Sequence, residues 1–238
     1  MTNKWLKVAL MVTAIATGTS IKIDAETVLY VPQDDRPVSL QYTVDTAREA
    51  GMTVLTPPQH LISGKTYQGQ ADQIMAWVEQ NAGRADVMVL STDTLIYGGL
   101  VDSRKHNIPL STLQNRLKRI EGLKARNKNV RIYGFGTVMR SPRASGGGTE
   151  PAYYAEYGPT IFQIAALQDK LDSGSLTQEE TQKMMSLQAS VPVEYLQDWF
   201  DRRQKNMKIN KELIDETRSG VFDYFALGHD DTSQLSQS

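Results

Sequence analysis

The chain has 238 residues, of which 40% are hydrophobic and 22% are charged, so it is long enough to bury a core in one or two domains. Its 26 basic and 27 acidic residues give a formal net charge of -1, which offers no electrostatic reason to expect nucleic acid or an anionic membrane as a partner. The absence of cysteine excludes disulfide scaffolds, thiolate metal sites, iron–sulfur clusters and cysteine nucleophiles.

Residues 1–25 have the composition of a secretory signal peptide. Two lysines precede the apolar stretch 8–16, and small and polar residues then run to Ala25, after which we expect cleavage. The apolar stretch is roughly half of the 20 or so residues that a membrane-spanning helix needs. A buried N-terminal helix is the alternative. We therefore expect a secreted or extracytoplasmic protein that has no membrane attachment after cleavage.

After residue 25, short β-rich runs alternate with segments of helical periodicity. Helices are predicted at residues 40–50 and 70–82, and a third is predicted to start with a capping box at Ser111 and Gln114. Alternation with short connections is typical of an α/β protein, here with a parallel sheet or partial barrel of about five strands. The predicted strands are residues 27–31, 53–55, 86–90, 130–135 and 224–227.

The segment 150–220 interrupts this alternation before the last strand. About three helices are predicted in it: one that starts at Pro159, one that starts with a capping box at Thr177, and a long one from Pro192 to near Gly220. We interpret this segment as a helical insertion beside the sheet, within one α/β domain of residues 26–238.

Polar residues gather directly after the predicted strands, where ligands bind in parallel α/β sheets. Two adjacent carboxylate pairs, Asp34 with Asp35 and Asp230 with Asp231, are the candidate catalytic residues. Clustered carboxylates serve either acid/base chemistry, as in glycoside hydrolysis, or a divalent cation such as Mg²⁺ or Ca²⁺. The three histidines lack metal-ligand spacing, so no metal ligand is assigned and no cofactor is expected. Helix capping by Asp is the alternative for each single residue.

Candidate substrate-binding residues follow the same strand ends and one face of the long helix. Amide and guanidinium donors on that helix face suit a hydroxyl-rich ligand, although an exposed polar stripe is an equally good interpretation. Tyr153, Tyr154 and Tyr157 suit either stacking against a sugar or packing in a core. The candidates for substrate binding are Arg36, Asp93, Tyr97 and Arg140 after the strands, and Arg203, Asn206 and Asn210 on the helix.

Several ordered motifs resemble those of a bacterial family catalogued as domain of unknown function 4127. The first is the strand end Val31-Pro-Gln-Asp-Asp-Arg-Pro-Val38, and others lie at residues 91–100, 103–107, 137–140, 156–159, 202–210 and 227–233. The resemblance implies that Arg104 and His106 are further substrate-binding positions, and it implies no established reaction. Gln33 and His229 depart from the family, which more often has Leu and Gln there.

Members of that family are about twice as long as this chain. A last parallel strand without a following helix would expose apolar surface and an open edge. We therefore expect the chain to be the N-terminal half of a longer protein, with the missing C-terminal half as a partner.

These features together favour an exported hydrolase that acts on a saccharide or glycosidic substrate through the clustered Asp residues. A non-catalytic saccharide- or ligand-binding surface protein is the first alternative. An inactive truncated fragment is the second.

Overall fold

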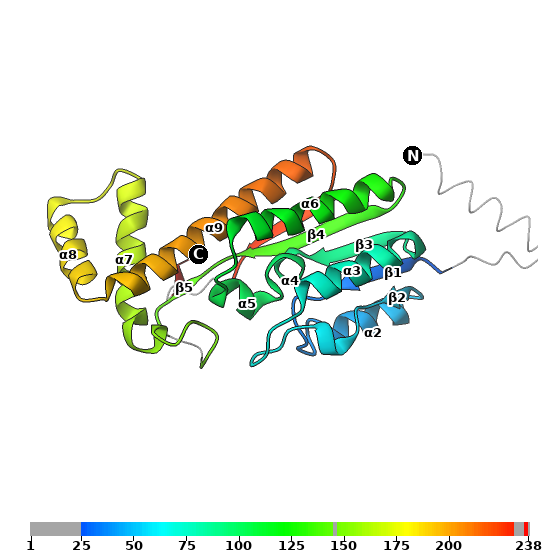
Figure 1. Ribbon diagram of the computed structural model, residues 1–238, viewed down its shortest axis with the longest axis horizontal. Helices are drawn as coiled ribbons and strands as arrows, with labels where there is room; N and C mark the ends of the chain where they lie inside the picture. Colours follow the sequence, from blue (N-terminus) through cyan, green and yellow to red (C-terminus); the bar gives the residue numbers. More distant parts are fainter. Residues whose placement is uncertain (1–24, 145–146, 231–235, 238) are drawn as a thin grey trace, which may run out of the picture.

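The computed structural model describes residues 25–144, 147–230 and 236–237, so the predicted leader up to residue 24 and Asp231 lie outside the described residues (Figure 1). Five parallel strands form one open sheet in the order β2-β1-β3-β4-β6, which confirms the α/β class and decides for an open sheet over a barrel. The strands are β1 Thr27–Val31, β2 Thr53–Leu55, β3 Val87–Ser91, β4 Arg131–Val138 and β6 Tyr224–His229. In a separate antiparallel pair, β5 Ser141–Pro142 lies beside β7 Ser236–Gln237.

Helices cover both faces of the sheet. Because side chains alternate along a strand, Leu29, Met88 and Ile132 all point to one face and are fully buried there. That face carries α3 Ala71–Asn81, α4 Thr92–Tyr97, α6 Leu110–Arg126 and the second half of α9 Val193–Arg218. On the opposite face, α2 Gln41–Glu49 packs Val44 against Tyr30 and Val54. Short 3₁₀ turns at Gln59–Leu61 and Ala82–Arg84 flank α3.

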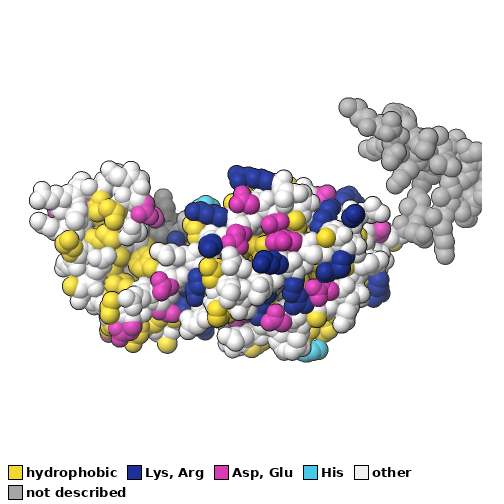
Figure 2. All heavy atoms as spheres, turned by 45° about the horizontal axis from the view of Figure 1, so that its top comes forward, with side chains coloured by type: hydrophobic (Ala, Val, Ile, Leu, Met, Phe, Trp, Pro, Cys, Tyr) yellow, Lys and Arg dark blue, Asp and Glu magenta, His cyan; other side chains and the backbone are white. Residues whose placement is uncertain are grey.

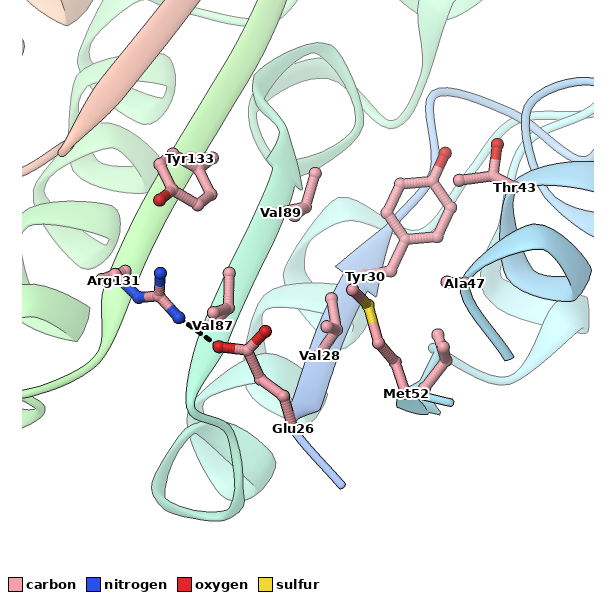
Figure 3. Close-up of a pocket in the computed structure, with 11 residues that line it drawn as sticks. Glu26, Val28, Tyr30, Thr43, Ala47, Met52, Val87, Val89, Arg131 and Tyr133 are labelled. Atoms are coloured by element: carbon pink, nitrogen blue, oxygen red, sulfur yellow. Dashed lines mark hydrogen bonds and ion pairs between the residues drawn. The ribbon is translucent and has the colours of Figure 1, made fainter. Parts of the chain in front are cut away.

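An apolar cavity of about 300 Å³ lies on the face of the sheet that carries α2 (Figure 3). Strand residues such as Val28, Val89 and Tyr133 line it, and an ion pair between Glu26 and Arg131 lies at one end. None of the predicted site residues lines this cavity, so the candidate chemistry belongs elsewhere on the sheet.

The segment before the last strand contains α7 Tyr154–Asp172, α8 Gln178–Ala189 and α9, which confirms the three predicted helices. These helices share a second hydrophobic core, in which the buried rings of Tyr154 and Trp199 lie 4.3 Å apart between centroids. Figure 1 shows α7 and α8 beyond the end of the sheet. Helix α9 joins the two cores, because Trp199 belongs to one and Ile209 to the other. Tyr154 is therefore a packing residue and does not form a surface for sugar stacking.

Two predicted helix starts are wrong and one is confirmed. Helix α6 begins after Pro109 with no side-chain cap, so Ser111 lies inside it. Pro159 lies within α7, five residues after its start, and the preceding Gly158 has no Cβ to clash with the proline ring. A Cβ at Gly158 would lie 2.6 Å from the ring of Tyr154. Thr177 forms the predicted capping box with Glu180.

The surface separates charged from hydrophobic side chains. Figure 2 shows basic and acidic side chains interspersed over the helices on the sheet, and hydrophobic side chains gathered at the end formed by α7 and α8. Leu171, Met185 and Val193 are the large hydrophobic residues exposed on α7, α8 and the start of α9. Within the described residues, no helix has both the length and the apolar character needed to cross a membrane.

Candidate functional site

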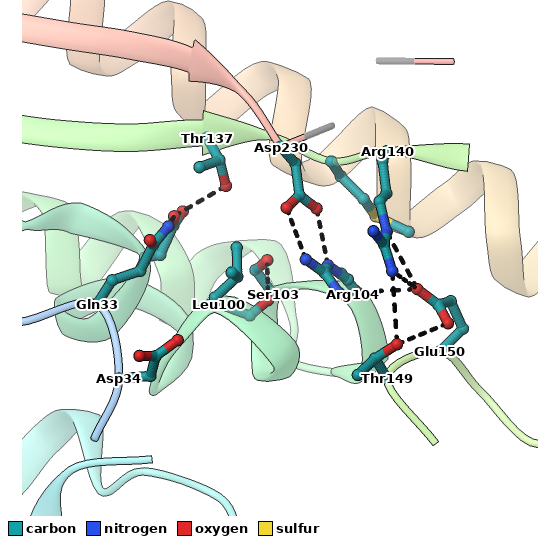
Figure 4. Close-up of polar contacts among 12 residues, drawn as sticks. Gln33, Asp34, Leu100, Ser103, Arg104, Thr137, Arg140, Thr149, Glu150 and Asp230 are labelled. Atoms are coloured by element: carbon teal, nitrogen blue, oxygen red, sulfur yellow. Dashed lines mark hydrogen bonds and ion pairs between the residues drawn. The ribbon is translucent and has the colours of Figure 1, made fainter. Parts of the chain in front are cut away.

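The candidate site lies at the carboxyl ends of the strands, where the strand order reverses. The chain runs from β1 outward to β2 and then returns to β3 on the other side of β1. Helices therefore leave β1 and β3 in opposite directions, and the loops between them open a crevice that parallel α/β proteins use for ligands. Figure 4 shows the polar residues that meet there: Gln33 and Asp34 after β1, Thr137 on β4, Arg104 on α5 Leu100–Lys105, and Asp230 after β6.

Asp93 is a deeply buried carboxyl group at this crevice, with 2% of its surface exposed. It lies in the first turn of α4, whose N-cap Ser91 accepts a hydrogen bond from the Thr94 amide. Asp93 Oδ2 accepts hydrogen bonds from Gln33 Nε2 at 3.0 Å and from Thr137 Oγ1 at 2.9 Å. Burial raises the pKa of Asp93 to about 6, since the two hydrogen bonds offset only part of the desolvation and the charge of Asp230 adds to it. Asp93 can therefore exchange a proton near neutral pH.

A buried charge network holds Arg104 and Arg140 at the same strand ends (Figure 4). Arg104 donates through Nε and Nη2 to the two oxygens of Asp230, at 2.7 and 2.6 Å, and its Nη1 lies 3.7 Å from Glu150 Oε1. Arg140 Nη2 lies 2.7 Å from the same Glu150 oxygen. Glu150 has no exposed side-chain surface and was not among the predicted site residues. The only local signal for it is an acidic residue between the glycine-rich loop and Pro151.

The structure separates the adjacent residues Asp34 and Asp35. Asp34 is buried and accepts bonds from the backbone amide of Arg36 at 3.2 Å and from its Nε at 2.8 Å. Asp35 accepts a bond from the Tyr67 hydroxyl and lines a different, open cavity. Only Asp34 of this pair therefore faces the crevice.

A cavity of about 310 Å³ opens at the crevice. Asp34 is its only carboxylate among the described residues, because Asp230 and Glu150 lie behind the arginines that they bind. The lining also contains leucine, valine, glycine and a threonine hydroxyl. The residues that line the cavity are Asp34, Arg36, Gly64, Lys65, Leu100, Val101, Arg104, Arg140 and Thr149.

The predicted polar face of α9 is bonded to backbone carbonyl groups. Asn206 Nδ2 donates to Ser103 O at 2.8 Å, and Asn210 Nδ2 donates to Thr137 O at 3.2 Å. Arg203 donates to Met139 O and, at 3.2 Å, to Ser141 Oγ. Both asparagines are buried, which rules out the alternative of an exposed stripe for them. Because none of the three lines the cavity, their contact with a substrate stays a prediction and their observed contacts hold α9 against the strand ends.

His106 and Tyr97 lie behind the crevice. His106 is buried, its Nε2 is 2.8 Å from Asn206 Oδ1, and its Nδ1 accepts from the Ile108 amide at 3.3 Å. Burial lowers the pKa of His106 to about 4, so the ring is neutral with its proton on Nε2. The Tyr97 ring stacks on it with centroids 4.9 Å apart, and the Tyr97 hydroxyl has no hydrogen-bond partner among the described residues. Both side chains line a separate cavity with Asp102 and Arg116.

The described residues contain no group of three or more His, Asp or Glu side chains placed to hold a metal ion. The Mg²⁺ or Ca²⁺ alternative therefore has no donor set in this part of the chain, while Asp231 lies outside it.

Comparison with protein families finds one whose model matches residues 28–238, described as "Protein of unknown function (DUF4127)". Neither the curated proteins nor the solved structures contain a match. What the site does must therefore be argued from its own residues.

Proposed function

The chain belongs to the DUF4127 family, and we propose that the carboxyl ends of its parallel strands form the active site of an exported hydrolase that acts on a saccharide. The observation that carries the proposal is Asp93, a buried carboxyl group with a pKa of about 6 at the point where the strand order reverses. Gln33 binds Asp93 and directly precedes Asp34, which lines the cavity. Asp230 raises the pKa of Asp93 through its charge and binds Arg104, which lines the same cavity. Asp93 is thus linked to the cavity wall through Gln33 on one side and through Asp230 on the other.

Hydrolysis of a glycosidic bond needs one carboxyl group that gives up a proton and one carboxylate that activates water or attacks the sugar. The pKa of Asp93, about 6, suits the first role, since such a group is partly protonated at neutral pH. Asp93 does not line the cavity, so its contact with a substrate stays a prediction. The position of Asp34 suits the second role, since it is the carboxylate on the cavity wall. Asp230 is a weaker candidate for the second role, since an arginine binds both oxygens of each carboxylate and only Asp34 of the two lines the cavity.

A panel of oligosaccharides, assayed for new reducing ends with the full chain, tests the proposal. We expect Asp34→Asn and Asp93→Asn each to lower the rate at least about 100-fold while circular dichroism stays unchanged, because general acid/base groups contribute at that scale. Asp215→Asn is the matched control, since Asp215 is exposed on α9 and pairs only with Arg218 among the described residues. Retention of the wild-type rate by both site variants would reject the assignment.

A binding protein without turnover is the second candidate. Arg36 bonds to both oxygens of Asp34, and Arg104 bonds to both oxygens of Asp230. Carboxylates whose charge is balanced by a bound arginine are also typical of ligand-recognition sites. Saccharide binding in the cavity without any new reducing ends would favour this function. An inactive fragment that requires a missing C-terminal half would bind no saccharide.

The proposal that the protein is exported rests on the sequence of residues 1–25 alone. Expression of the full chain in a bacterium, followed by mass spectrometry of the extracytoplasmic fraction, should find a mature chain that starts at Glu26. Leu10→Arg places a charge in the apolar stretch and should leave the uncleaved chain inside the cell. An uncleaved wild-type chain in the cytoplasm would reject export.

A further inference from the structure

The cavity beside Asp34 presents mainly cations. We propose that it binds an anionic group of the substrate, such as a carboxylate, phosphate or sulfate, so that the protein selects acidic saccharides over neutral ones. The inference rests on the proposed function in that it names the substrate class of the same site.

The first support is the charge of the cavity wall. Among the described residues that line it, four of nine are basic and only Asp34 is acidic. The four basic residues come from separate parts of the chain: Arg36 follows β1, Lys65 precedes α3, Arg104 lies in the last turn of α5 and Arg140 follows β4. The tertiary structure therefore concentrates positive charge in one hollow of a chain whose net charge is only -1.

The second support is the position of the counter-ions. Asp230 and Glu150 have 2% and 0% of their side chains exposed and do not line the cavity. They hold the guanidinium groups of Arg104 and Arg140 from behind, which fixes the orientation of these groups before a ligand arrives. A fixed guanidinium group loses little conformational entropy when it binds an oxyanion, and its planar donors match carboxylate and phosphate oxygens.

The third support is a pair of accessible cations on the same wall. Lys65 is exposed and forms no ion pair within the described residues, and the Arg36 side chain is 54% exposed. A Cβ at Gly147 would lie 3.9 Å from Lys65 Nζ, so the lysine extends toward the glycine-rich loop that leads to Thr149. An anion that enters the cavity would meet these exposed cations first and the more deeply buried Arg104 and Arg140 next. Such an arrangement favours both capture and orientation of a charged substrate.

The test compares sugars that differ in one group. D-galacturonic acid, galactose 6-phosphate and D-galactose are titrated into the full chain by calorimetry or protein-observed NMR. We expect the two acidic sugars to bind about 10- to 100-fold more tightly than galactose, as charge-assisted hydrogen bonds allow. Added salt should weaken the binding of the two acidic sugars and leave the binding of galactose unchanged.

Lys65→Gln locates the effect in the cavity. The substitution should weaken the binding of galacturonic acid about tenfold and leave the binding of galactose unchanged. Because Lys65 is exposed, the variant should fold normally. Lys118→Gln, at an exposed position of α6 away from the cavity, is the matched control. Equal effects of the two variants would overturn the inference.

Failure of this inference is distinguishable from failure of the proposed function. Galactose that binds as tightly as galacturonic acid would overturn the anionic subsite and leave the saccharide hydrolase intact. Inorganic phosphate that binds as tightly as galactose 6-phosphate, with loss in Lys65→Gln, would support the subsite and count against a saccharide substrate. Binding of no probe would overturn both.

Discussion

Arg104 and Asp230, which are 126 residues apart in the chain, form a buried ion pair through two parallel hydrogen bonds of 2.7 and 2.6 Å. Arg104 lies in the last turn of the short helix α5, which comes after β3 in the chain, whereas Asp230 follows β6 at the edge of the sheet. The pair therefore connects the outermost strand to the crevice where the strand order reverses. It also keeps a guanidinium group on the cavity wall.

Removal of one partner of this ion pair should destabilise the protein strongly. Arg104→Met leaves Asp230 buried without its cation, and breaking a buried pair in this way costs about 3–5 kcal/mol. Urea unfolding of the full chain measures the change. The control is Arg218→Met, whose ion pair with Asp215 is exposed and should contribute less than about 1 kcal/mol. Similar costs for the two variants would contradict a buried pair.

Asp93→Asn should stabilise the protein in a pH-dependent manner. The folded chain has a pKa of about 6 at Asp93, against 3.8 for an unperturbed group, so between these values the native state binds more protons than the unfolded state. Stability therefore falls as the pH rises from about 4 to about 6, and the full penalty of about 3 kcal/mol persists at higher pH. Asn removes the charge and keeps an oxygen for Gln33 and Thr137.

Urea unfolding at pH 7.5 and at pH 4 measures this difference. The variant should exceed the wild type at pH 7.5 and match it at pH 4. Asp215→Asn, at an exposed site, should show no such dependence. A loss of stability in Asp93→Asn at pH 7.5 would show that the carboxylate is better solvated than its burial indicates.

The imidazole of His106 should remain neutral throughout the physiological range. Burial lowers its pKa to about 4, whereas an unperturbed histidine has a pKa of 6.5, so stability contributed by this group is lost only as the pH falls below about 6. Nitrogen-15 NMR should show a protonated Nε2 and an unprotonated Nδ1 of His106 with constant shifts between pH 6 and pH 8. Titration of His106 near pH 6.5 would contradict the buried contact with Asn206.

Asn206→Leu should destabilise the contact between α9 and the strand ends. The amide donates to Ser103 O and accepts from His106 Nε2, and both partners would remain buried without a bond. Each unsatisfied buried group costs about 1–3 kcal/mol, so the two together should cost about 2–6 kcal/mol by urea unfolding. Lys208→Leu changes an exposed position on the same helix and should have little effect. A neutral Asn206→Leu would show that the amide is not required there.

The sequence predicts the secondary structure well where periodicity extends over several residues. All five strands of the main sheet and the long helix α9 lie within a few residues of their predicted positions. The sequence does not predict α4 and α5, because six residues are too few to show a clear helical period and polar residues directly after a strand are typical of loops. Ser111 and Pro159 were misleading because Pro109 and Gly158 set the local backbone around them.

The sequence also indicates which residues gather at the candidate site, without showing how they pair. Polar residues after parallel strands must meet at one edge of the sheet, so the gathering of Asp34, Asp93, Arg140 and Asp230 follows from topology alone. Glu150 lies in a loop outside that rule and could not be found in this way. The opposite directions of Asp34 and Asp35 depend on local contacts with Arg36 and Tyr67.

The sequence by itself thus determined the α/β class, the absence of thiol chemistry and the strand ends that carry the polar residues. Those properties depend on composition and on local periodicity, which are written along the chain. Only the tertiary structure decided that Arg104 pairs with Asp230, that the counter-ions lie behind the arginines, and that the amide face of α9 binds backbone carbonyl groups. Those properties depend on burial and on distances between segments about a hundred residues apart, and no local pattern encodes them.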